Sequence, residues 1–502
     1  MTRDSSLARL ADAILLPPFP GRSAPRWLLA ALGRGLAGVA LFGQNVAAPD
    51  QLAALTSRLR ETAGDPVIAI DEEGGDVTRI AHATGSPYPG NAALGAADDV
   101  ALTSEIYRLI GSDLAAAGVT VNLAPCVDVN TASDNPVIGT RSFGADTALV
   151  ARHAAAAVTG LQSAGVAACA KHFPGHGSTR DDSHYMIAAV DGDIGQVRRR
   201  DLPPFAAAVV AGAQAVMAGH LRVPGLTGTR PATWSAAALS GLLRGELGFT
   251  GVIICDALEM RAVAEPHGLP EAAVRTVAAG ADLLCLGADQ DEEAYLAVRA
   301  ALTTAVAEGR LPARRLEGAA ARVSRLRSRL ANPRPAATGA PPANGSHCVR
   351  AATGDTEAGL AAARRALRVS GLARPPADPV VVELSPLRNI AAGTVPWGLG
   401  PWLGGNVLRL DTTQRGPGLG AAVAGLLARA AGRPLVIVVR DAHRHPVART
   451  LTTALVTAHP DATVVEMGLP LWRPPAGAHI ATFGAARPNA QAAAEVLGLV
   501  SG

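Results

Sequence analysis

The sequence is poor in charged and aromatic residues. Only 17% of its 502 residues are charged and only 3% are aromatic, and the net charge is +3. A nearly neutral chain without basic runs lacks the electrostatic footprint of a nucleic-acid-binding protein. No apolar run approaches the ~20 residues that a membrane helix needs. We therefore expect neither nucleic acid nor a membrane as a partner.

Cysteine is also scarce, with five residues and no CxxC pair. Cys126, Cys169 and Cys255 lie in apolar segments typical of strands. Scattered thiols of this kind argue against a disulfide framework and a thiolate zinc site, and they fit a reducing compartment. Prolines interrupt the first apolar run, Ile14–Leu16, so the N-terminus does not resemble a signal peptide. The sequence predicts a cytoplasmic monomer that needs no cofactor.

Short apolar runs recur through residues 1–330 and alternate with Ala- and Leu-rich segments of helical spacing. Continuous apolar runs are typical of parallel strands buried on both faces. Eight such runs predict a (β/α)8 TIM-type barrel, with an open doubly wound sheet as the alternative. The predicted strands are Ala13–Leu16, Gly38–Phe42, Val67–Asp71, Val121–Cys126, Val166–Lys171, Ala215–His220, Val252–Asp256 and Asp282–Leu286.

A Pro-, Gly- and Ala-rich segment interrupts this pattern at residues 332–347 and is typical of a linker. Beyond it, strand-like runs such as Val380–Leu384 and Leu435–Arg440 alternate with helix-like segments again. We therefore expect a catalytic barrel at 1–331, a linker at 332–347 and a smaller α/β sandwich domain at 348–502.

Charged and imidazole side chains stand at the ends of five predicted strands. In parallel barrels, functional groups collect at the C-terminal ends of the strands. Five strands that deliver such groups to one rim predict an active site there. The strand-end residues are Asp71, Asp128, Lys171, His172, His220 and Asp256, and Arg141 lies further along the segment that follows Asp128.

The densest cluster is the Gly-rich loop KHFPGHGSTRDDSH at 171–184. The spacing allows Asp182 to accept a hydrogen bond from one ring nitrogen of His184, which leaves the other nitrogen for proton transfer. An alternative is a zinc site, because imidazole and carboxylate ligands suit that metal. Its ligands would be His172, His176, Asp182 and His184, but no HExxH-type helix accompanies them.

Taken as a set, the motifs resemble glycoside hydrolase family 3, and within it the bacterial β-N-acetylglucosaminidases of peptidoglycan recycling. From about Gly38 to Gly287 they are AIDEEGG, NLAPCVDVN, NPVIGTRSFG, KHFPGHG with DSH, and GVIICDALEM. The resemblance implies that Asp256 is the nucleophile and that His184, paired with Asp182, is the acid/base. It also implies that sugar hydroxyls are bound by Asp71, Arg79, Arg141, Lys171, His172 and His220.

The activity implied is retaining, exo-acting removal of terminal β-linked N-acetylglucosamine through a glycosyl-aspartate, from peptidoglycan fragments or chito-oligosaccharides. Four positions depart from the family pattern: Asp76 replaces a basic residue, Cys255 a serine, Ala257 an aspartate and Glu259 a serine. The alternatives are a phosphorylase that uses the same residues, a metal-dependent hydrolase and a non-catalytic sugar-binding protein. Four tryptophans outside the motifs are expected to pack rather than to bind sugar: Trp234, Trp397, Trp402 and Trp472.

Overall fold

The computed structural model describes residues 3–265, 267–331, 355–371, 375–385, 390–403, 407–413 and 419–500. These residues divide into two compact units. Unit 1 contains the described residues within 1–72, 100–135 and 145–354, and unit 2 contains those within 73–99, 136–144 and 355–502. The linker expected at 332–347 and Cys348 lie outside the described residues.

Unit 1 is built on eight parallel strands in the order β1-β10-β9-β7-β5-β4-β3-β2. The Ala40 N–H donates to Pro17 O at 3.4 Å, which joins the two ends of the sheet into a nearly closed barrel. The predicted (β/α)8 class is confirmed, and the open-sheet alternative is wrong. The strands are β1 (Leu15–Leu16), β2 (Gly38–Leu41), β3 (Val67–Ile70), β4 (Val121–Asn122), β5 (Ala167–Phe173), β7 (Ala215–Ala218), β9 (Val252–Cys255) and β10 (Leu283–Cys285).

Small and branched side chains fill the interior of the barrel. Ala69, Ala167 and Ala215 share this core with larger residues such as Ile254 and Leu283. Small residues fit there because an eight-stranded barrel is only wide enough to be filled by its own side chains. The polar residues of the predicted site follow this apolar core at the C-terminal ends of the strands.

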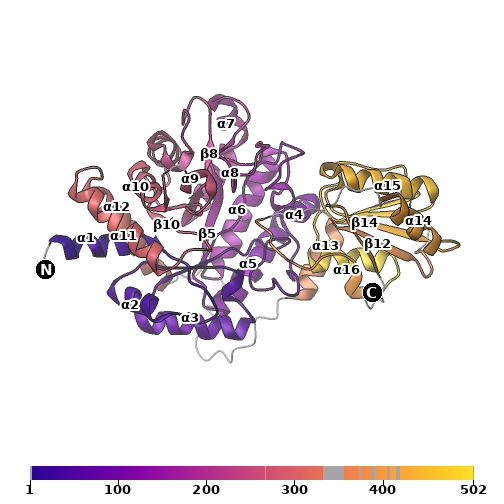
Figure 1. The fold of residues 1–502 in the computed structure, drawn as a ribbon, viewed down its shortest axis with the longest axis horizontal. Helices are drawn as coiled ribbons and strands as arrows, with labels where there is room; N and C mark the ends of the chain where they lie inside the picture. Colours follow the sequence, from indigo (N-terminus) through magenta and orange to yellow (C-terminus); the bar gives the residue numbers. More distant parts are fainter. Residues whose placement is uncertain are drawn as a thin grey trace. The chain divides into compact units, whose positions relative to one another are not determined.

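Helices cover the outside of the barrel (Figure 1). α6 (Thr147–Ser163) is typical: the Asp146 side chain caps its first turn by accepting the Leu149 N–H at 2.7 Å, and a buried stripe faces inward. The other helices of unit 1 are α1 (Arg3–Asp12), α2 (Arg26–Arg34), α3 (Pro49–Ala63), α5 (Val100–Ala116), α7 (Ile194–Arg200), α8 (Leu202–Val210), α9 (Arg261–Ala264), α10 (Leu269–Ala279), α11 (Glu292–Ala307) and α12 (Ala313–Ala331).

Unit 2 has a six-stranded sheet in the order β11-β16-β15-β14-β12-β13, parallel except for the edge strand β11. Alternate residues face opposite layers: Val380 and Val382 pack in one apolar cluster, whereas Val381 packs in the other. The strands are β11 (Arg368–Ser370), β12 (Val380–Ser385), β13 (Leu408–Asp411), β14 (Leu435–Val439), β15 (Thr463–Glu466) and β16 (Ala478–Ala481).

Helices lie on both faces of this sheet, so the predicted α/β sandwich is confirmed (Figure 1). α14 and α15 contribute to the cluster that holds Val380, and α16 contributes to the cluster that holds Val381. The helices of unit 2 are α4 (Asn91–Ala97), α13 (Thr356–Ala366), α14 (Leu419–Arg429), α15 (Pro446–Ala458) and α16 (Arg487–Val496).

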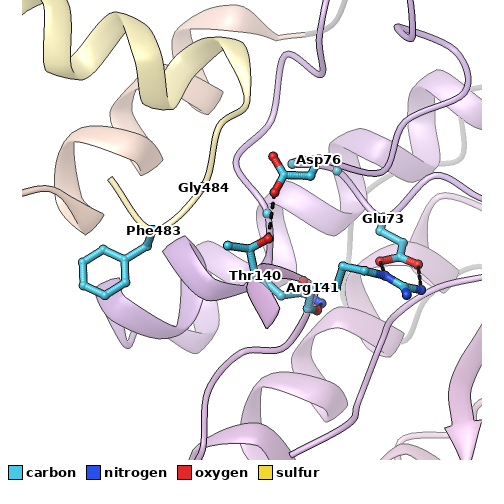
Figure 2. A pocket seen from close by; sticks show the side chains of 10 residues that line it. Glu73, Asp76, Thr140, Arg141, Phe483 and Gly484 are labelled. Atoms are coloured by element: carbon cyan, nitrogen blue, oxygen red, sulfur yellow. Dashed lines mark hydrogen bonds and ion pairs between the residues drawn. The ribbon is translucent and has the colours of Figure 1, made fainter. Parts of the chain in front are cut away.

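Asp76, the first departure from the family pattern, is an anchor inside unit 2. Its Oδ2 accepts the Thr140 hydroxyl at 2.7 Å and pairs with the Arg440 guanidinium at 3.0 Å. Its Oδ1 accepts the Ala485 N–H at 3.2 Å. Figure 2 shows Asp76 with Thr140 in a small pocket of this unit that Phe483 also lines. The carboxylate therefore connects both inserted segments, 73–99 and 136–144, to the C-terminal sheet.

Of the helices in the described ranges, none is both long and apolar enough to cross a membrane.

Candidate active site

The predicted dyad forms a short hydrogen bond in the loop that follows β5. The His184 Nδ1–H donates to Asp182 Oδ1 at 2.6 Å, and the His184 backbone N–H donates to the same oxygen at 2.9 Å. This pairing fixes the ring tautomer and leaves Nε2 for proton transfer. Burial opposes ionisation of Asp182, but the hydrogen bonds from His184 hold the pKa of that carboxyl below its usual value. The Asp182 carboxylate thus stays charged and remains an acceptor for the His184 ring.

Hydrogen bonds hold the base of this loop against the segment after β4. The Ala132 N–H donates to Gly177 O at 3.1 Å, and the Asn135 side chain donates to His176 O at 2.8 Å. A side chain at Gly177 would not fit, since a Cβ there would lie 2.0 Å from Val129 O. The glycines of the motif therefore permit a close approach of two backbone segments.

His176 organises the loop from inside. Its Nδ1 bonds to Thr179 Oγ1 at 2.6 Å and its Nε2 bonds to Ser183 Oγ at 2.9 Å. Only 1% of His176 is exposed. Both ring nitrogens are thus engaged within the loop, which fits a structural role and leaves no nitrogen for a metal.

One backbone hydrogen bond connects the dyad to the strand that carries the predicted nucleophile. The Arg261 N–H donates to His184 O at 3.2 Å, and Arg261 begins α9, shortly after β9 and Asp256. The side chains of Asp182 and His184 are 24% and 27% exposed. The dyad is therefore held beside the loop after β9 and is accessible to a ligand.

Asp256 directly follows β9 at the C-terminal end of the barrel. Its Oδ1 accepts the Ala257 N–H at 2.8 Å. Burial alone would raise the pKa of Asp256, but the charges of His172, His220 and His184 lower it below the usual value. Asp256 is thus held as an ionised carboxylate at the strand end, and attack on an anomeric carbon requires an ionised carboxylate.

Lys171 is the only lysine among the 45 Lys and Arg residues of the chain. Its side chain is 2% exposed, and its Nζ lies 2.6 Å from Oδ1 of Asp71, which is 21% exposed. All the other residues of this pair of types are arginines, so an ammonium group occurs only at this position. A planar guanidinium differs from an ammonium in shape and hydration and is therefore not an equivalent replacement. The ion pair presents fixed donors and an acceptor of the kind that bind sugar hydroxyls.

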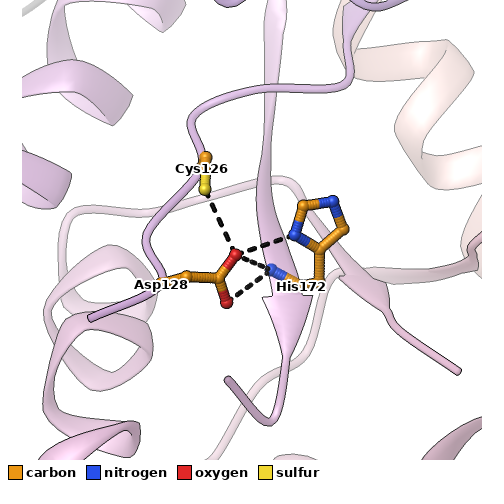
Figure 3. Close-up of side chains that lie close together, drawn as sticks. All are labelled: Cys126, Asp128 and His172. Carbon is orange, nitrogen blue, oxygen red and sulfur yellow. Dashed lines mark hydrogen bonds and ion pairs between the residues drawn. The ribbon is translucent and has the colours of Figure 1, made fainter. Parts of the chain in front are cut away.

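Asp128, one of the predicted strand-end residues, accepts hydrogen bonds from four donors. Its oxygens accept the His172 Nδ1–H at 2.8 Å, the His172 N–H at 3.2 Å and the His176 N–H at 2.7 Å. The Cys126 thiol donates at 3.2 Å, as Figure 3 shows. Burial would raise the pKa of Asp128, but His172 lowers it to about 2. Asp128 therefore fixes the orientation of the His172 ring through Nδ1.

Cys126, Asp128 and His172 also stand close enough to share a metal ion, with their ligand atoms within 4.8 Å of one another. The Asp128 oxygens, however, already accept the hydrogen bonds just described. The residues of the alternative zinc site form no such group in the part of the chain that the structure describes. The donor geometry thus favours a positioning role for Asp128 over metal binding.

His220 is fully buried, and burial lowers its pKa. Its Nε2 bonds to Ala257 O at 3.0 Å and its Nδ1 bonds to Thr233 Oγ1 at 2.9 Å. The ring therefore supports the backbone just after Asp256, and Ala257 takes part through its carbonyl rather than its side chain. A direct sugar contact of His220 stays a prediction.

Arg141 and Arg79 lie in unit 2. Arg141 makes a buried bidentate pair with Glu73, with distances of 2.9 and 2.7 Å. The Arg79 guanidinium donates to Ala391 O at 2.9 Å. Both side chains are thus held by partners in their own unit, and their predicted contacts with sugar stay predictions.

Glu259, another departure from the family pattern, supports a neighbouring loop of the barrel rim. Its carboxylate accepts the backbone N–H groups of Ala288 and Asp289 and the Gln290 side chain, the last at 3.1 Å. Sequence patterns gave no indication of this role, because the partners lie some thirty residues away in the chain.

The chain is similar to proteins named β-hexosaminidase. The chain is 33% identical over 321 residues to β-hexosaminidase A of Pseudoalteromonas piscicida, which covers 59% of this chain and 54% of that protein. The chain thus spans about half the length of that relative. It is 36% identical over 282 residues to a β-hexosaminidase of Stenotrophomonas maltophilia, which covers 55% of this chain and 83% of that one.

A solved family 3 β-N-acetylglucosaminidase from Paenibacillus sp. FPU-7 matches with a TM-score of 0.86 and 31% identity over 100% of this chain and 97% of that one. The model of the glycosyl hydrolase family 3 N-terminal domain matches residues 27–326, which include every predicted site residue. The resemblance carried by the motifs is thereby confirmed, and the chain belongs to glycosyl hydrolase family 3.

Proposed function

We propose that this protein is a retaining, exo-acting β-N-acetylglucosaminidase in which Asp256 is the nucleophile and His184, aligned by Asp182, is the acid/base. The main support is the grouping of these side chains at the barrel rim. The charge of His184 contributes to the lowered pKa of Asp256, and a backbone hydrogen bond joins the two loops. The relatives named β-hexosaminidase support the substrate class.

In the first step, Asp256 attacks the anomeric carbon while protonated His184 gives its Nε2 proton to the leaving oxygen. Lys171, Asp71 and His172 hold the sugar hydroxyls, and Asp182 stabilises the imidazolium through Nδ1. A covalent glycosyl-aspartate forms, and the aglycone leaves as an alcohol. Neutral His184 remains beside the new ester.

In the second step, His184 accepts a proton from water as the water oxygen attacks the anomeric carbon. The bond to Asp256 breaks, the carboxylate is regenerated and N-acetylglucosamine leaves with retained configuration. A histidine suits both steps because its usual pKa of about 6.5 lies near neutrality. Peptidoglycan fragments and chito-oligosaccharides with terminal N-acetylglucosamine are the proposed substrates, in keeping with the exo-acting site.

The test is to trap the intermediate with a slow fluorinated N-acetylglucosaminide and to map the label by mass spectrometry of peptides. We expect the label on the peptide that contains Asp256 and none on the Asp256→Asn protein. A label on Asp71 or Asp128, or turnover by the Asp256→Asn protein, would remove Asp256 from its proposed role.

Phosphorolysis is the second candidate, because the proton-transfer group is an imidazole rather than a carboxylate. A protonated dyad carries no net charge and repels phosphate less than a lone carboxylate would. Product analysis with and without phosphate separates the two reactions. N-acetylglucosamine as the main product in phosphate supports hydrolysis, and its 1-phosphate supports the phosphorylase.

A further inference from the structure

Unit 2 contains an open groove of about 550 Å³ that is remote in sequence from the family 3 motifs. Its lining comes from one face of α15 and from the segment after β15, and contains Pro446, Arg449, Thr450, Thr453, Ala454 and Trp472. The α15 residues recur at the three- and four-residue spacing of a single helix face. The volume lies within the range of small-molecule sites.

Trp472 is held rigidly and yet contributes to the groove wall. One part of the side chain packs against the apolar cluster of β12, β14 and α15, and the residue is only partly exposed. Its indole N–H has no hydrogen-bond partner in the described parts of the chain. A fixed ring with a free polar edge is a preorganised platform for a ligand that has one apolar face and a polar rim.

Arg449 brings a charge to the same groove. Neither a hydrogen bond nor an ion pair engages its guanidinium within the described ranges, and no carboxylate lines the groove. Thr450 and Thr453 add hydroxyl groups nearby. The lining therefore combines an aromatic platform, hydroxyls and an unpaired cation, which complements a sugar ring that bears a carboxylate.

We propose that this groove is a second saccharide site, which binds an anionic N-acetylated glycan chain with a pyranose ring on Trp472 and a carboxylate on Arg449. The choice of a saccharide rests on the proposed function, whereas the groove and its charge do not. Such a site would keep a glycan chain attached to the protein between successive removals of terminal sugars.

Affinity electrophoresis of the full chain through gels that contain soluble carboxymethyl chitin or uncharged glycol chitin tests the proposal. We expect the wild type to bind the anionic polymer more tightly. Arg449→Ala should weaken that binding by about tenfold and leave binding to glycol chitin unchanged, since one charge-assisted contact is lost. Trp472→Ala should weaken binding to both polymers.

The matched control is Arg429→Ala, which removes the same charge from an exposed position on α14. All these variants keep the residues of the barrel site, so binding of glycan chain ends at that site contributes equally to the retardation of each protein. Hydrolysis of a small aryl N-acetyl-β-glucosaminide should not change in any of them. Equal retardation of Arg449→Ala and Arg429→Ala would overturn the proposal, as would no retardation of the wild type. An absence of hydrolysis in every protein, by contrast, would count against the proposed function alone.

Discussion

At the scale of single residues, Lys171 offers the sharpest test of the sugar-binding group. The side chain is buried beside Asp71, and an arginine there has to place a larger planar group in the same space. We expect Lys171→Arg to lower kcat/KM for an aryl N-acetyl-β-glucosaminide by about 100-fold, because misplacement of a binding group by about 1 Å has that cost. The exposed Arg58→Lys serves as control, and a Lys171→Arg enzyme as active as this control would refute the assignment.

The dyad predicts a dependence on the leaving group. Asp182→Asn keeps the size of the side chain but removes the charge that stabilises the His184 imidazolium. We expect kcat/KM for chitobiose to fall by about 10²–10⁴, as for loss of general acid catalysis, and that for a dinitrophenyl glycoside to fall far less. The neighbouring exposed carboxylate provides the control Asp181→Asn, which should behave like wild type with both substrates. Equal losses with both leaving groups would contradict the role of Asp182.

Asp128 predicts a pH dependence of stability. Its pKa is about 2 in the folded protein and 3.8 without its partners, so its contribution to stability is complete above about pH 5 and is lost as the pH falls toward 2. The size is about 2 kcal/mol. We expect Asp128→Asn to be less stable than wild type by about this amount at neutral pH, and the gap to narrow by about 1 kcal/mol between about pH 5 and pH 3. Urea unfolding at each pH measures the gap, and a constant gap would exclude this linkage.

Single residues also show which parts of the site can be predicted from the sequence alone. The Asp182–His184 bond follows from a spacing of two residues, and the strand-end positions of Lys171 and Asp256 follow from the barrel. The roles of Asp128 and Glu259 do not, because each depends on partners that folding brings from distant segments.

At the scale of elements, apolar runs identified the barrel strands because strands buried on both faces need no alternation. The edge strand β11 was not predicted from the sequence, because its three residues RVS are largely exposed and pair antiparallel with β16 only in the folded unit. The short pair β6 (Ala188–Ala189) and β8 (Leu221–Arg222), which holds the far end of the loop after β5, was not predicted either.

The loop after β5, which contains Gly177, gives the prediction at this scale. Gly177→Ala would bring a Cβ to 2.0 Å from Val129 O, so the two backbone segments have to separate. We expect a loss of about 2–4 kcal/mol in stability together with a large loss of activity, measured by thermal melting and by hydrolysis of an aryl glycoside. Gly33→Ala, on a helix with open space around the new methyl group, should leave both unchanged or slightly improve stability. Equal behaviour of the two variants would show that the close approach is not needed.

At the scale of the whole molecule, the chain is not divided simply at the expected linker. Segments 73–99 and 136–144 precede the linker in sequence but group with the C-terminal residues. The Asp76–Arg440 pair, the Asp99–Arg365 pair and the hydrogen bond from Arg79 to Ala391 O connect them. Nothing in local periodicity could reveal this grouping, because it arises from pairs separated by more than two hundred residues.

This grouping predicts the result of truncation. A fragment of residues 1–331 keeps all barrel strands but deprives the two segments of the C-terminal partners of Asp76, Arg79 and Asp99. Asp76 then loses both the Arg440 guanidinium and the Ala485 N–H, and the surface that the C-terminal residues cover on the two segments is exposed to water. We expect the fragment to be less soluble, to melt at a lower temperature and to be cleaved by protease within 73–99 and 136–144 first. A fragment as stable and protease-resistant as the full chain would mean that the two segments do not depend on the C-terminal residues.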